Sequence, residues 1–380
     1  RSMVYTMPEF LERRYNPQSR TILSVISLVS YVLTKVAVTV YAGGLVFQQV
    51  FGIKELWGID FFWIAAIGLV VLTALYTIFG GMKSVLYTSV LQTPILLLGS
   101  LIILVLGFKE LGGWDEMMRV CGAVTVNDYD DTMTNLIRSN DDANFPWLGA
   151  LIGSAIIGFW YWCTDQFIVQ RVLSGKNEME ARRGTIFGAY LKLLPVFLFL
   201  IPGMIAFALH QKYIGAGGEG FLPMLANGTA NADAAFPTLV AKLLPAGVKG
   251  LVVCGILAAL MSSLASLFNS SAMLFTIDFY KRFKPETPEK KLVGIGQIAT
   301  IVIVVLGILW IPIMRSVGDV LYTYLQDVQS VLAPGIAAAF LLGICWKRTS
   351  AQGGMWGLIS GMVIGLTRLG AKVYYSNAGE

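Results

Sequence analysis

Long apolar stretches, one after another, constrain this chain more than any other feature of its sequence. A helix needs about 20 mostly apolar residues to cross a bilayer. Nine stretches reach that length, at residues 18–50, 57–80, 83–108, 147–171, 184–210, 246–280, 291–314, 317–345 and 352–373. Charged residues make up 13% of the chain, against roughly 25% in soluble domains, and the mean hydropathy is +0.69. The sequence therefore predicts an all-α polytopic membrane protein with about nine transmembrane helices.

Basic residues gather in the short connections, which sets the expected orientation. More than half of the 28 Lys and Arg residues fall in five short segments, at 1–20, 83, 171–183, 281–291 and 347–348. The two long connections, 109–146 and 211–245, are acidic or polar. Because Lys and Arg are enriched in cytoplasmic loops, we expect a multi-pass protein of the plasma membrane with a cytoplasmic N-terminus.

Several classes of function are disfavoured by the composition. The net charge of +5 is spread over short loops, so we expect the lipid bilayer and no nucleic acid as a partner. The chain has one histidine, His210, which leaves no histidine cluster for a metal or an acid–base relay, so we expect no enzyme. The four cysteines show neither metal spacing nor a disulfide framework: Cys121, Cys163, Cys254 and Cys345. The chain begins at Arg1 rather than Met, and we expect that an N-terminal part precedes it.

A row of aromatic and polar residues interrupts the apolar stretch at 156–177. The row is WYWCTDQ at 160–166, followed by an apolar run that ends at Arg171. A carboxylate inside a membrane span is costly, so Asp165 should face protein, water or a ligand. Three adjacent aromatic rings cannot share one helix face, so some of them point inward, where a flat ring can stack on a sugar or close a pore. An interfacial aromatic belt is the alternative interpretation.

Proline and glycine interrupt two further stretches. The first of these interruptions comprises Pro195, Pro202 and Gly203, and the second comprises Pro334 and Gly335. Broken helices at bilayer depth are tolerated where they are buried or line a cavity, and in transporters they often mark the binding site. We therefore predict a helix break at each place, with a simple kink as the alternative.

The stretch FWYWCTDQFIVQRVLS resembles the sixth core helix of sodium/glucose cotransporters, in the sodium:solute symporter family. Three more stretches resemble that family in the same order and spacing: TMPEFLERRYN near the start, Gly80-Gly81 followed by YTSVLQT, and AALMSSLASLFNSS followed by TIDFYKR. The resemblance covers essentially all 380 residues.

That resemblance implies a fold of two five-helix inverted repeats, of the leucine-transporter type, with substrate held near the midplane. On the family pattern, residues 1–380 form a single transmembrane transporter domain that lacks the first spans. Residues 18–108 would be the remainder of the first repeat, 147–345 the second repeat, and 352–373 an additional helix.

Three residues of the stretch AALMSSLAS are candidates for binding sodium. Hard cations prefer oxygen ligands, and Ala259, Ser262 and Ser263 share one helical face, where they offer a carbonyl and two hydroxyls. The resemblance implies that they bind the co-transported sodium ion, together with carbonyls of the missing first helix. Close packing of small residues between helices is the alternative.

Five residues are candidates for the sugar site. The resemblance implies that Tyr161 is the inner gate under the sugar and that Lys192 and Gln326 hydrogen-bond to its hydroxyls. Trp162 and Asp165 match the sugar-transporter pattern and either contact the sugar or shape the site. The alternatives are that Lys192 is a structural partner of Asp165 and that Gln326 makes an interhelical hydrogen bond.

Two positions depart from the family pattern. Gly158 stands where sugar-binding relatives often have Asn or Thr, and Ser89 stands where relatives usually carry an acid. The first departure removes a sugar contact, and the second puts the cation release path in doubt. Lys35 is a further cation within an apolar stretch, to which no role beyond pairing can be given.

These expectations combine into a sodium-coupled symporter that takes a hexose, glucose or galactose, into the cell by alternating access. One alternative keeps the mechanism but changes the solute to inositol, a nucleoside, sialic acid or an amino acid. A different class, a sugar-gated channel or sensor on the same fold, also remains open.

Overall fold

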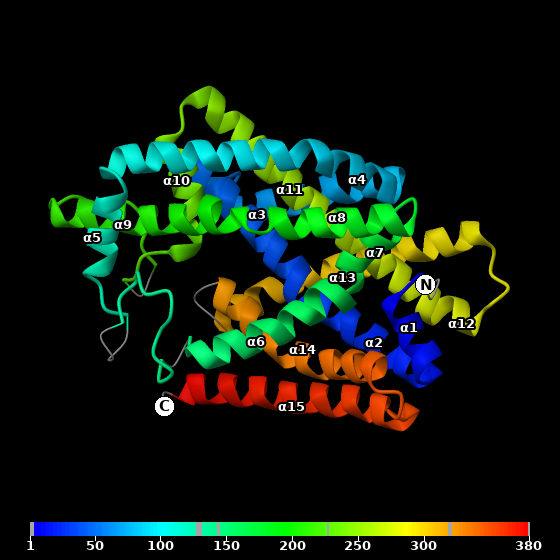
Figure 1. The fold of residues 1–380 in the computed structure, drawn as a ribbon. Helices are drawn as coiled ribbons and strands as arrows, with labels where there is room; N and C mark the ends of the chain where they lie inside the picture. The colour runs from blue at the N-terminus through cyan, green and yellow to red at the C-terminus, as the bar shows by residue number, and fades with distance from the viewer. Residues whose placement is uncertain (1–3, 127–130, 143–144, 226–227, 318–320, 379–380) are drawn as a thin grey trace.

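A computed structural model describes residues 4–126, 131–142, 145–225, 228–317 and 321–378, and these are almost entirely helical (Figure 1). The first part contains α1 (Met7–Arg14), α2 (Pro17–Ser30), the π-helix η1 (Tyr31–Val36), α3 (Ala37–Phe51), the short antiparallel strands β1 (Glu55–Leu56) and β2 (Ile59–Asp60), α4 (Phe61–Leu111) and α5 (Trp114–Gly122).

The second part begins after the long connection. Its elements are α6 (Trp147–Phe159), the π-helix η2 (Trp160–Thr164), α7 (Gln166–Leu173), α8 (Glu178–Leu191), the π-helix η3 (Val196–Leu200), α9 (Ile201–Gly215), the 3-10 turn η4 (Ala232–Ala234), α10 (Ala235–Leu243), α11 (Ala246–Met273), the π-helix η5 (Leu274–Tyr280), α12 (Lys281–Phe283), α13 (Glu289–Val317), α14 (Leu321–Cys345) and α15 (Ala351–Ala378).

Seven helical segments in the described part of the chain are long and apolar enough to cross a membrane: Pro17–Phe51, Ser89–Leu111, Trp147–Thr164, Glu178–Gly215, Ala246–Phe283, Glu289–Pro312 and Tyr324–Cys345. The predicted span at 57–80 contains a shorter apolar helix, Phe61–Thr77. The ninth predicted span corresponds to the glycine-rich α15, which is not one of the seven. The prediction of an all-α polytopic membrane protein is confirmed.

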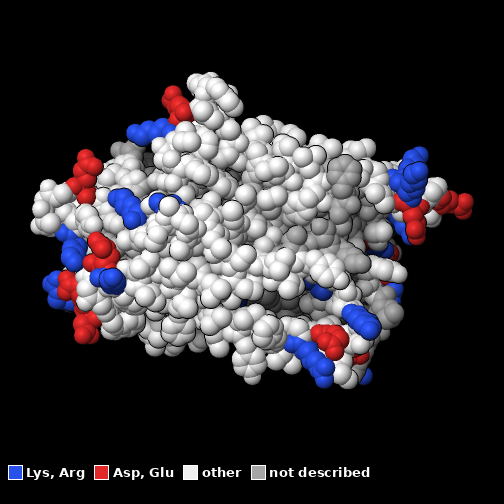
Figure 2. Space-filling view, turned by 90° about the horizontal axis from the view of Figure 1, so that it is seen from above, with Lys and Arg blue, Asp and Glu red and all other residues white. Residues whose placement is uncertain are grey.

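The distribution of charge on the surface agrees with a membrane environment. Charged side chains gather at the two ends of the molecule, and the band between them is mostly uncharged (Figure 2). Large apolar side chains are exposed on several helices, among them Val105 on α4, Ile152 on α6 and Ile364 on α15. An apolar surface of this extent is unusual on a monomeric soluble protein, and hydrocarbon chains can cover it.

The long helix α4 is not a straight rod. Leu69 and Ser89 would lie about 30 Å apart along a straight helix. However, Leu69 packs with Gly43 beside Leu260 of α11, and the Ser89 hydroxyl lies 2.6 Å from the hydroxyl of Ser262, also on α11. Because one turn of α11 contacts both positions, α4 folds back between them. Its two halves correspond to two of the predicted spans.

The two predicted helix breaks have different outcomes. Near Pro195 the regular α-helix is interrupted, because α8 ends at Leu191 and the π-helix η3 begins at Val196, yet Glu178–Gly215 remains one helical segment. Pro202 and Gly203 lie within α9 and do not break it. At Pro334 the prediction is wrong, because α14 runs unbroken from Leu321 to Cys345. A Cβ atom on Gly335 would lie 3.1 Å from the Cα of Gly361, so the glycine allows α14 to pack closely against α15.

The motif TMPEFLERRYN folds as a helical corner that fastens α1 to the end of α14. Thr6 caps α1 by accepting a hydrogen bond from the backbone N–H of Glu9 at 3.2 Å, which is a common way to start a helix. The Arg14 guanidinium donates to the backbone carbonyls of Gly343 at 2.6 Å and Trp346 at 3.0 Å. This motif, which is part of the family resemblance, therefore attaches α1 to the end of α14 in this protein.

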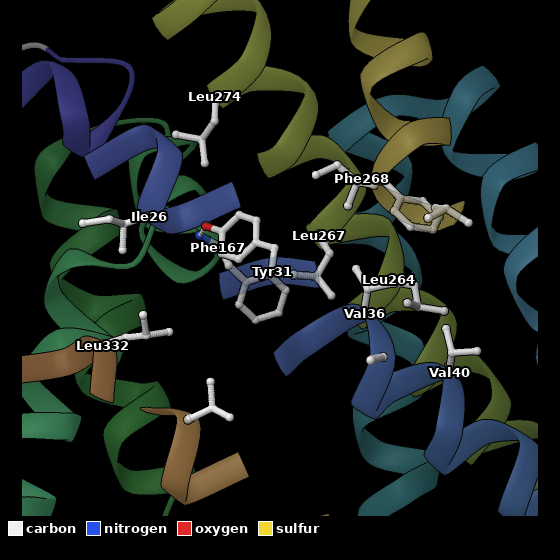
Figure 3. Packing of buried hydrophobic residues seen from close by; sticks show 14 of the residues in the cluster. Ile26, Tyr31, Val36, Val40, Phe167, Leu264, Leu267, Phe268, Leu274 and Leu332 are labelled. Carbon is white, nitrogen blue, oxygen red and sulfur yellow. Dashed lines mark hydrogen bonds between the residues drawn. The ribbon is translucent and has the colours of Figure 1, made fainter. Parts of the chain in front are cut away.

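The largest apolar core lies where α2, η1, α7, α11 and α14 meet. In Figure 3 the rings of Tyr31 and Phe167 lie beside each other, with Leu267 nearby. These side chains are 1%, 8% and 1% exposed, respectively. Phe167 of α7 belongs to this core, so the packing around it holds the start of α7 in place.

Candidate functional site

The aromatic and polar row contains a helix break at Asp165, which the sequence did not predict. The five residues before it form the π-helix η2, Asp165 itself is extended with φ −77° and ψ 120°, and α7 starts at Gln166. The Asp165 carboxylate accepts a hydrogen bond from the backbone N–H of Phe167 at 3.1 Å, so it caps α7. π-Helical turns of this kind are frequent at functional sites.

A buried cluster of polar side chains surrounds the Asp165 carboxylate. Lys35, from η1, forms an ion pair with it, and the Tyr31 hydroxyl donates to it at 2.9 Å. The Tyr31 oxygen also accepts from the N–H of Phe167 at 3.0 Å. The Lys35 and Asp165 side chains are 8% and 3% exposed, so each charge depends on the other for compensation.

This cluster corrects one expectation and supplies a role for Lys35. The alternative in which Lys192 pairs with Asp165 is wrong, because Lys35 holds that place. Aromatic rings also surround the Lys35 ammonium, with centroids at 4.4 Å for Phe167 and 5.1 Å for Tyr161. The tertiary structure thus links Lys35 to the aromatic row, which sequence reasoning did not foresee.

The three adjacent aromatic residues of η2 point into different environments, as expected. Trp160 is buried, Tyr161 is half-buried, and Trp162 is 48% exposed. The rings of Tyr161 and Trp162 meet edge to face, with centroids 5.2 Å apart. Lys192 is exposed at the end of α8, and its ammonium lies over the Trp162 ring at 4.8 Å. Tyr161, Trp162 and Lys192 therefore lie close together.

Gln326 lies on α14, which packs against both α6 and η2. Its side chain is half-buried. The start of this helix is fixed by Asp233, whose carboxylate oxygens accept from the backbone N–H of Leu321 at 3.1 and 3.2 Å. Burial raises the pKa of Asp233, and the hydrogen bond from Leu321 acts in the opposite direction. Packing thus brings the helix of Gln326 alongside the aromatic row.

The predicted sodium residues occupy one turn of α11, where α4 contacts it. Ser262 is buried, and Ala259 and Ser263 are half-buried. The Ser262 hydroxyl lies 2.6 Å from the Ser89 hydroxyl. Ser89 departs from the family pattern at a position expected to bear on the cation release path, and the structure places it directly at this turn. The turn therefore offers uncharged oxygens of the kind that sodium prefers.

Two residues of α7 reach the same part of α11. Gln170 donates to the backbone carbonyl of Ser266 at 2.9 Å, and Arg171 donates to the Ser266 hydroxyl. That hydroxyl donates in turn to the carbonyl of Ser262 at 3.0 Å. A chain of hydrogen bonds thus joins the helix that follows Asp165 to the turn that carries the candidate sodium ligands. From the sequence, Arg171 was counted only among the basic residues of the short connections. Nothing in the stretch around Asp165 indicated that Arg171 contacts Ser266.

A comparison of the sequence with models of known protein families identifies the family of this chain. The model of the sodium:solute symporter family matches residues 1–361. The chain belongs to the sodium:solute symporter family.

Several curated proteins resemble this symporter-family chain over nearly its whole length. The sodium/myo-inositol cotransporter 2 of Homo sapiens is 38% identical over 96% of this chain and 55% of its own length. The sodium/mannose cotransporter SLC5A10 of Bos taurus is 38% identical over 97% of this chain and 62% of its own length. The sodium/glucose cotransporter 4 of Mus musculus is 37% identical over 98% and 55%. The chain thus spans between half and two thirds of the length of these relatives.

A solved structure confirms the symporter fold. It is the substrate-bound, outward-open state of a Na+-coupled sialic acid symporter, with a TM-score of 0.71 over 97% of this chain and 77% of that one. The sequence identity is 21%, so this likeness bears on the fold alone. In this member of the family, the candidate residues therefore lie on η2, α11 and α14 or directly after η2 and α8, within a symporter-type bundle.

Proposed function

We propose that this protein works in the plasma membrane as a sodium-coupled symporter that brings a hexose into the cell by alternating access. The observation that carries the proposal is the hydrogen-bond chain from Arg171 through Ser266 to Ser262. It joins the helix following the aromatic row to the oxygen-rich turn of α11. Symport needs such a link, because the ion and the solute must both favour the same state of the protein.

In this proposal the sodium ion binds at the turn of α11. The carbonyl of Ala259 and the hydroxyls of Ser262 and Ser263 are its ligands from this chain. A cation bound to the Ser262 hydroxyl would shift this turn of α11, and Ser266, which donates to the Ser262 carbonyl, would follow together with Arg171. Sodium binding would thereby favour one position of α7 and of the aromatic row before it.

The sugar would lie against the aromatic row, with Tyr161 below it. Aromatic rings offer a flat apolar face to a sugar, while Lys192 and Gln326 supply hydrogen bonds to its hydroxyls. Trp162 holds the ammonium of Lys192 beside this place through the cation–π contact. The Asp165 carboxylate already bonds to Lys35 and Tyr31. We therefore propose that Asp165 positions η2 and does not bind the sugar directly.

The domain organisation and orientation are parts of the same proposal. Residues 18–108 would form the remainder of the first repeat, 147–345 the second repeat and 352–373 an additional helix of one transporter domain at 1–380. The N-terminus would lie in the cytoplasm, because the short basic connections are expected on that side.

Uptake into proteoliposomes tests the proposal. Full-length protein should accumulate radiolabelled glucose or galactose when a sodium gradient points inward, and should stop when choline replaces sodium. Uptake that is unchanged in choline would contradict sodium coupling. Sugar-dependent current without accumulation against a gradient would favour the channel or sensor.

A second candidate keeps sodium coupling and changes the solute to a cyclitol. The observation that favours it is that a relative at 38% identity is named a sodium/myo-inositol cotransporter. A competition panel of unlabelled glucose, galactose, mannose and myo-inositol against labelled hexose separates the two. Stronger inhibition by myo-inositol than by any hexose would decide for the cyclitol.

A further inference from the structure

A cavity of about 480 Å³ lies away from the candidate transport residues, between the first half of α4, the α11–η5 helix and α13. None of the residues assigned to sugar or sodium lines it. The volume falls within the range of roughly 300–1000 Å³ that is usual for ligand sites. The cavity therefore has room for a ligand of its own.

The residues that line the cavity extend along the helices. It extends on the α11 side from Phe268 to Lys281 and on the α13 side from Thr300 to Glu289. At 1.5 Å per residue, these intervals correspond to about 20 Å and about 16 Å. One leaflet of a bilayer, half of a hydrocarbon core of about 30 Å, has a similar thickness. The cavity thus begins at one end of the molecule, and its length is about the thickness of a single leaflet.

The walls of the cavity are mainly apolar, while its mouth is charged. Leu292 and Val293 of α13 and Ala272 and Met273 of α11 are among the residues that line it. Lys281 and Glu289 lie at the mouth, at the end of the bundle that carries α12. An apolar interior with a charged mouth fits an amphipathic ligand.

Unpaired lysines surround this mouth. The segment 281–291 has five basic and two acidic residues, hence a net charge of +3. Within the part of the chain that the structure describes, none of its lysines forms an ion pair: Lys281, Lys284, Lys290 and Lys291. Arg282, by contrast, donates to the carbonyl of Pro17 and the hydroxyl of Thr21. The lysines are therefore free to bind an anion.

A second hollow adjoins the mouth and is lined by Lys284 and Lys291. Its volume is about 390 Å³, and Tyr280 and residues 285–288 complete its wall. Phe283, which directly precedes Lys284, is 80% exposed. An exposed aromatic ring next to lysines is typical of a surface that sits at the headgroup level of a bilayer.

We propose that this corner binds one anionic phospholipid. The phosphate-bearing headgroup lies among Lys281, Lys284 and Lys291, and one acyl chain fills the cavity between α4, α11 and α13. Charge complementarity selects an anionic headgroup over a zwitterionic one, and the one-leaflet depth of the apolar slot selects a lipid over a soluble phosphate.

Native mass spectrometry of the full-length protein tests the proposal, with phosphatidylglycerol and phosphatidylcholine as probes. The test variant is Lys281→Gln with Lys284→Gln and Lys291→Gln. The matched control removes as many exposed basic residues elsewhere, by Lys176→Gln, Lys347→Gln and Arg348→Gln. A lysine at an anionic lipid surface is worth roughly fivefold in affinity, so the test variant should bind phosphatidylglycerol about 100-fold more weakly. The control should bind like the parent.

Three outcomes would overturn the proposal. They are undiminished phosphatidylglycerol binding by the test variant, an equal loss in the control, and equal binding of phosphatidylcholine by the parent. Inorganic phosphate should not displace phosphatidylglycerol, because it cannot fill the slot, and displacement by it would also contradict the lipid.

A labelling experiment in the unmodified protein does not depend on how any variant folds. Phosphatidylglycerol with a diazirine in its acyl chain should label peptides that contain Met273 or Leu292. The substitution Val293→Trp, at a position that is 62% exposed, should plug the slot and abolish this labelling. Labelling spread evenly over the lipid-facing helices would overturn the proposal.

Discussion

Lys35 and Asp165 form an ion pair inside the helix bundle although 130 residues separate them in the chain. Lys35 belongs to the π-helix η1, and Asp165 lies where the π-helix η2 ends and α7 begins. The pair therefore joins two places at which regular α-helical geometry is interrupted. Because the aromatic row precedes Asp165 directly, the position of Tyr161 depends on this buried contact.

Breaking this pair should destabilise the protein strongly. Asp165→Asn leaves the Lys35 ammonium buried without a counter-charge, which costs about 3–5 kcal/mol. Adding Lys35→Met should restore part of the loss, because the buried charge is then gone. Thermal unfolding in detergent measures both effects. Arg182→Ala removes an exposed pair with Glu178 and should cost less than about 1 kcal/mol. If Asp165→Asn alone is as stable as the parent, the pair does not hold η2.

Tyr161→Ala should weaken concentrative sugar uptake while leaving the protein folded. The ring is half-buried and packs against Trp162, and a stacked ring contributes very roughly 1–2 kcal/mol. Tyr161→Phe keeps the ring and is the matched control. Uptake by proteoliposomes and elution on size exclusion give the two readouts. If the alanine variant accumulates sugar like the parent, Tyr161 belongs to an interfacial aromatic belt and does not contact the sugar.

Lys192→Ala and Gln326→Ala should raise the apparent constant for sugar more than the constant for sodium. Each variant would leave a sugar hydroxyl without its partner, at a cost of about 1–3 kcal/mol. Initial uptake rates measured over sugar and sodium concentrations separate the two constants. Lys192→Arg, which keeps the charge over Trp162, serves as the control. A parallel rise in both constants would point to a general structural role.

Ser262→Ala and Ser263→Ala should report on sodium first and on sugar only through coupling. Removing one neutral oxygen ligand costs on the order of 1–3 kcal/mol, so the sodium constant should rise about tenfold or more. Sugar binding should recover at saturating sodium and stay weak at low sodium, since linkage makes the two affinities reciprocal. A sodium titration of sugar binding shows this. If the sugar-binding curves of both variants match those of the parent at every sodium concentration, these serines serve helix packing and do not bind sodium.

Ser266→Ala should uncouple the two sites without removing either one. Its hydroxyl lies between Arg171 and the carbonyl of Ser262, so its loss interrupts the connection from α7 to α11. The factor by which saturating sodium raises sugar affinity should fall, while sugar affinity without sodium stays near the parent value. Ser271→Ala is the control, because this buried hydroxyl on the same helix makes no hydrogen bond within the described residues. If saturating sodium raises the sugar affinity of Ser266→Ala by the same factor as in the parent, Ser266 does not take part in the coupling.

The sequence by itself determined the class of the protein and located the seven helical segments that are long and apolar enough to cross a membrane. Apolar length and the cost of burying charge are properties of a local stretch, and they can be read without knowing any neighbour. The same local reasoning predicted that Asp165 would face away from lipid and that the three adjacent aromatic residues would diverge. Both features are present in the structure. The family was also recognisable, because its motifs are contiguous.

Only the tertiary structure decided which distant residues meet. Lys35 rather than Lys192 pairs with Asp165, and Ser89 lies against Ser262, because helix packing sets these contacts. Pro334 was read as a break, yet α14 remains helical, with Gly335 packed against Gly361 of α15. In a bilayer every span is apolar, so hydrophobicity fixes which residues are helical but not which helices touch or in what register. That choice rests on shape and on buried polar partners, and those are brought together only by the folded bundle.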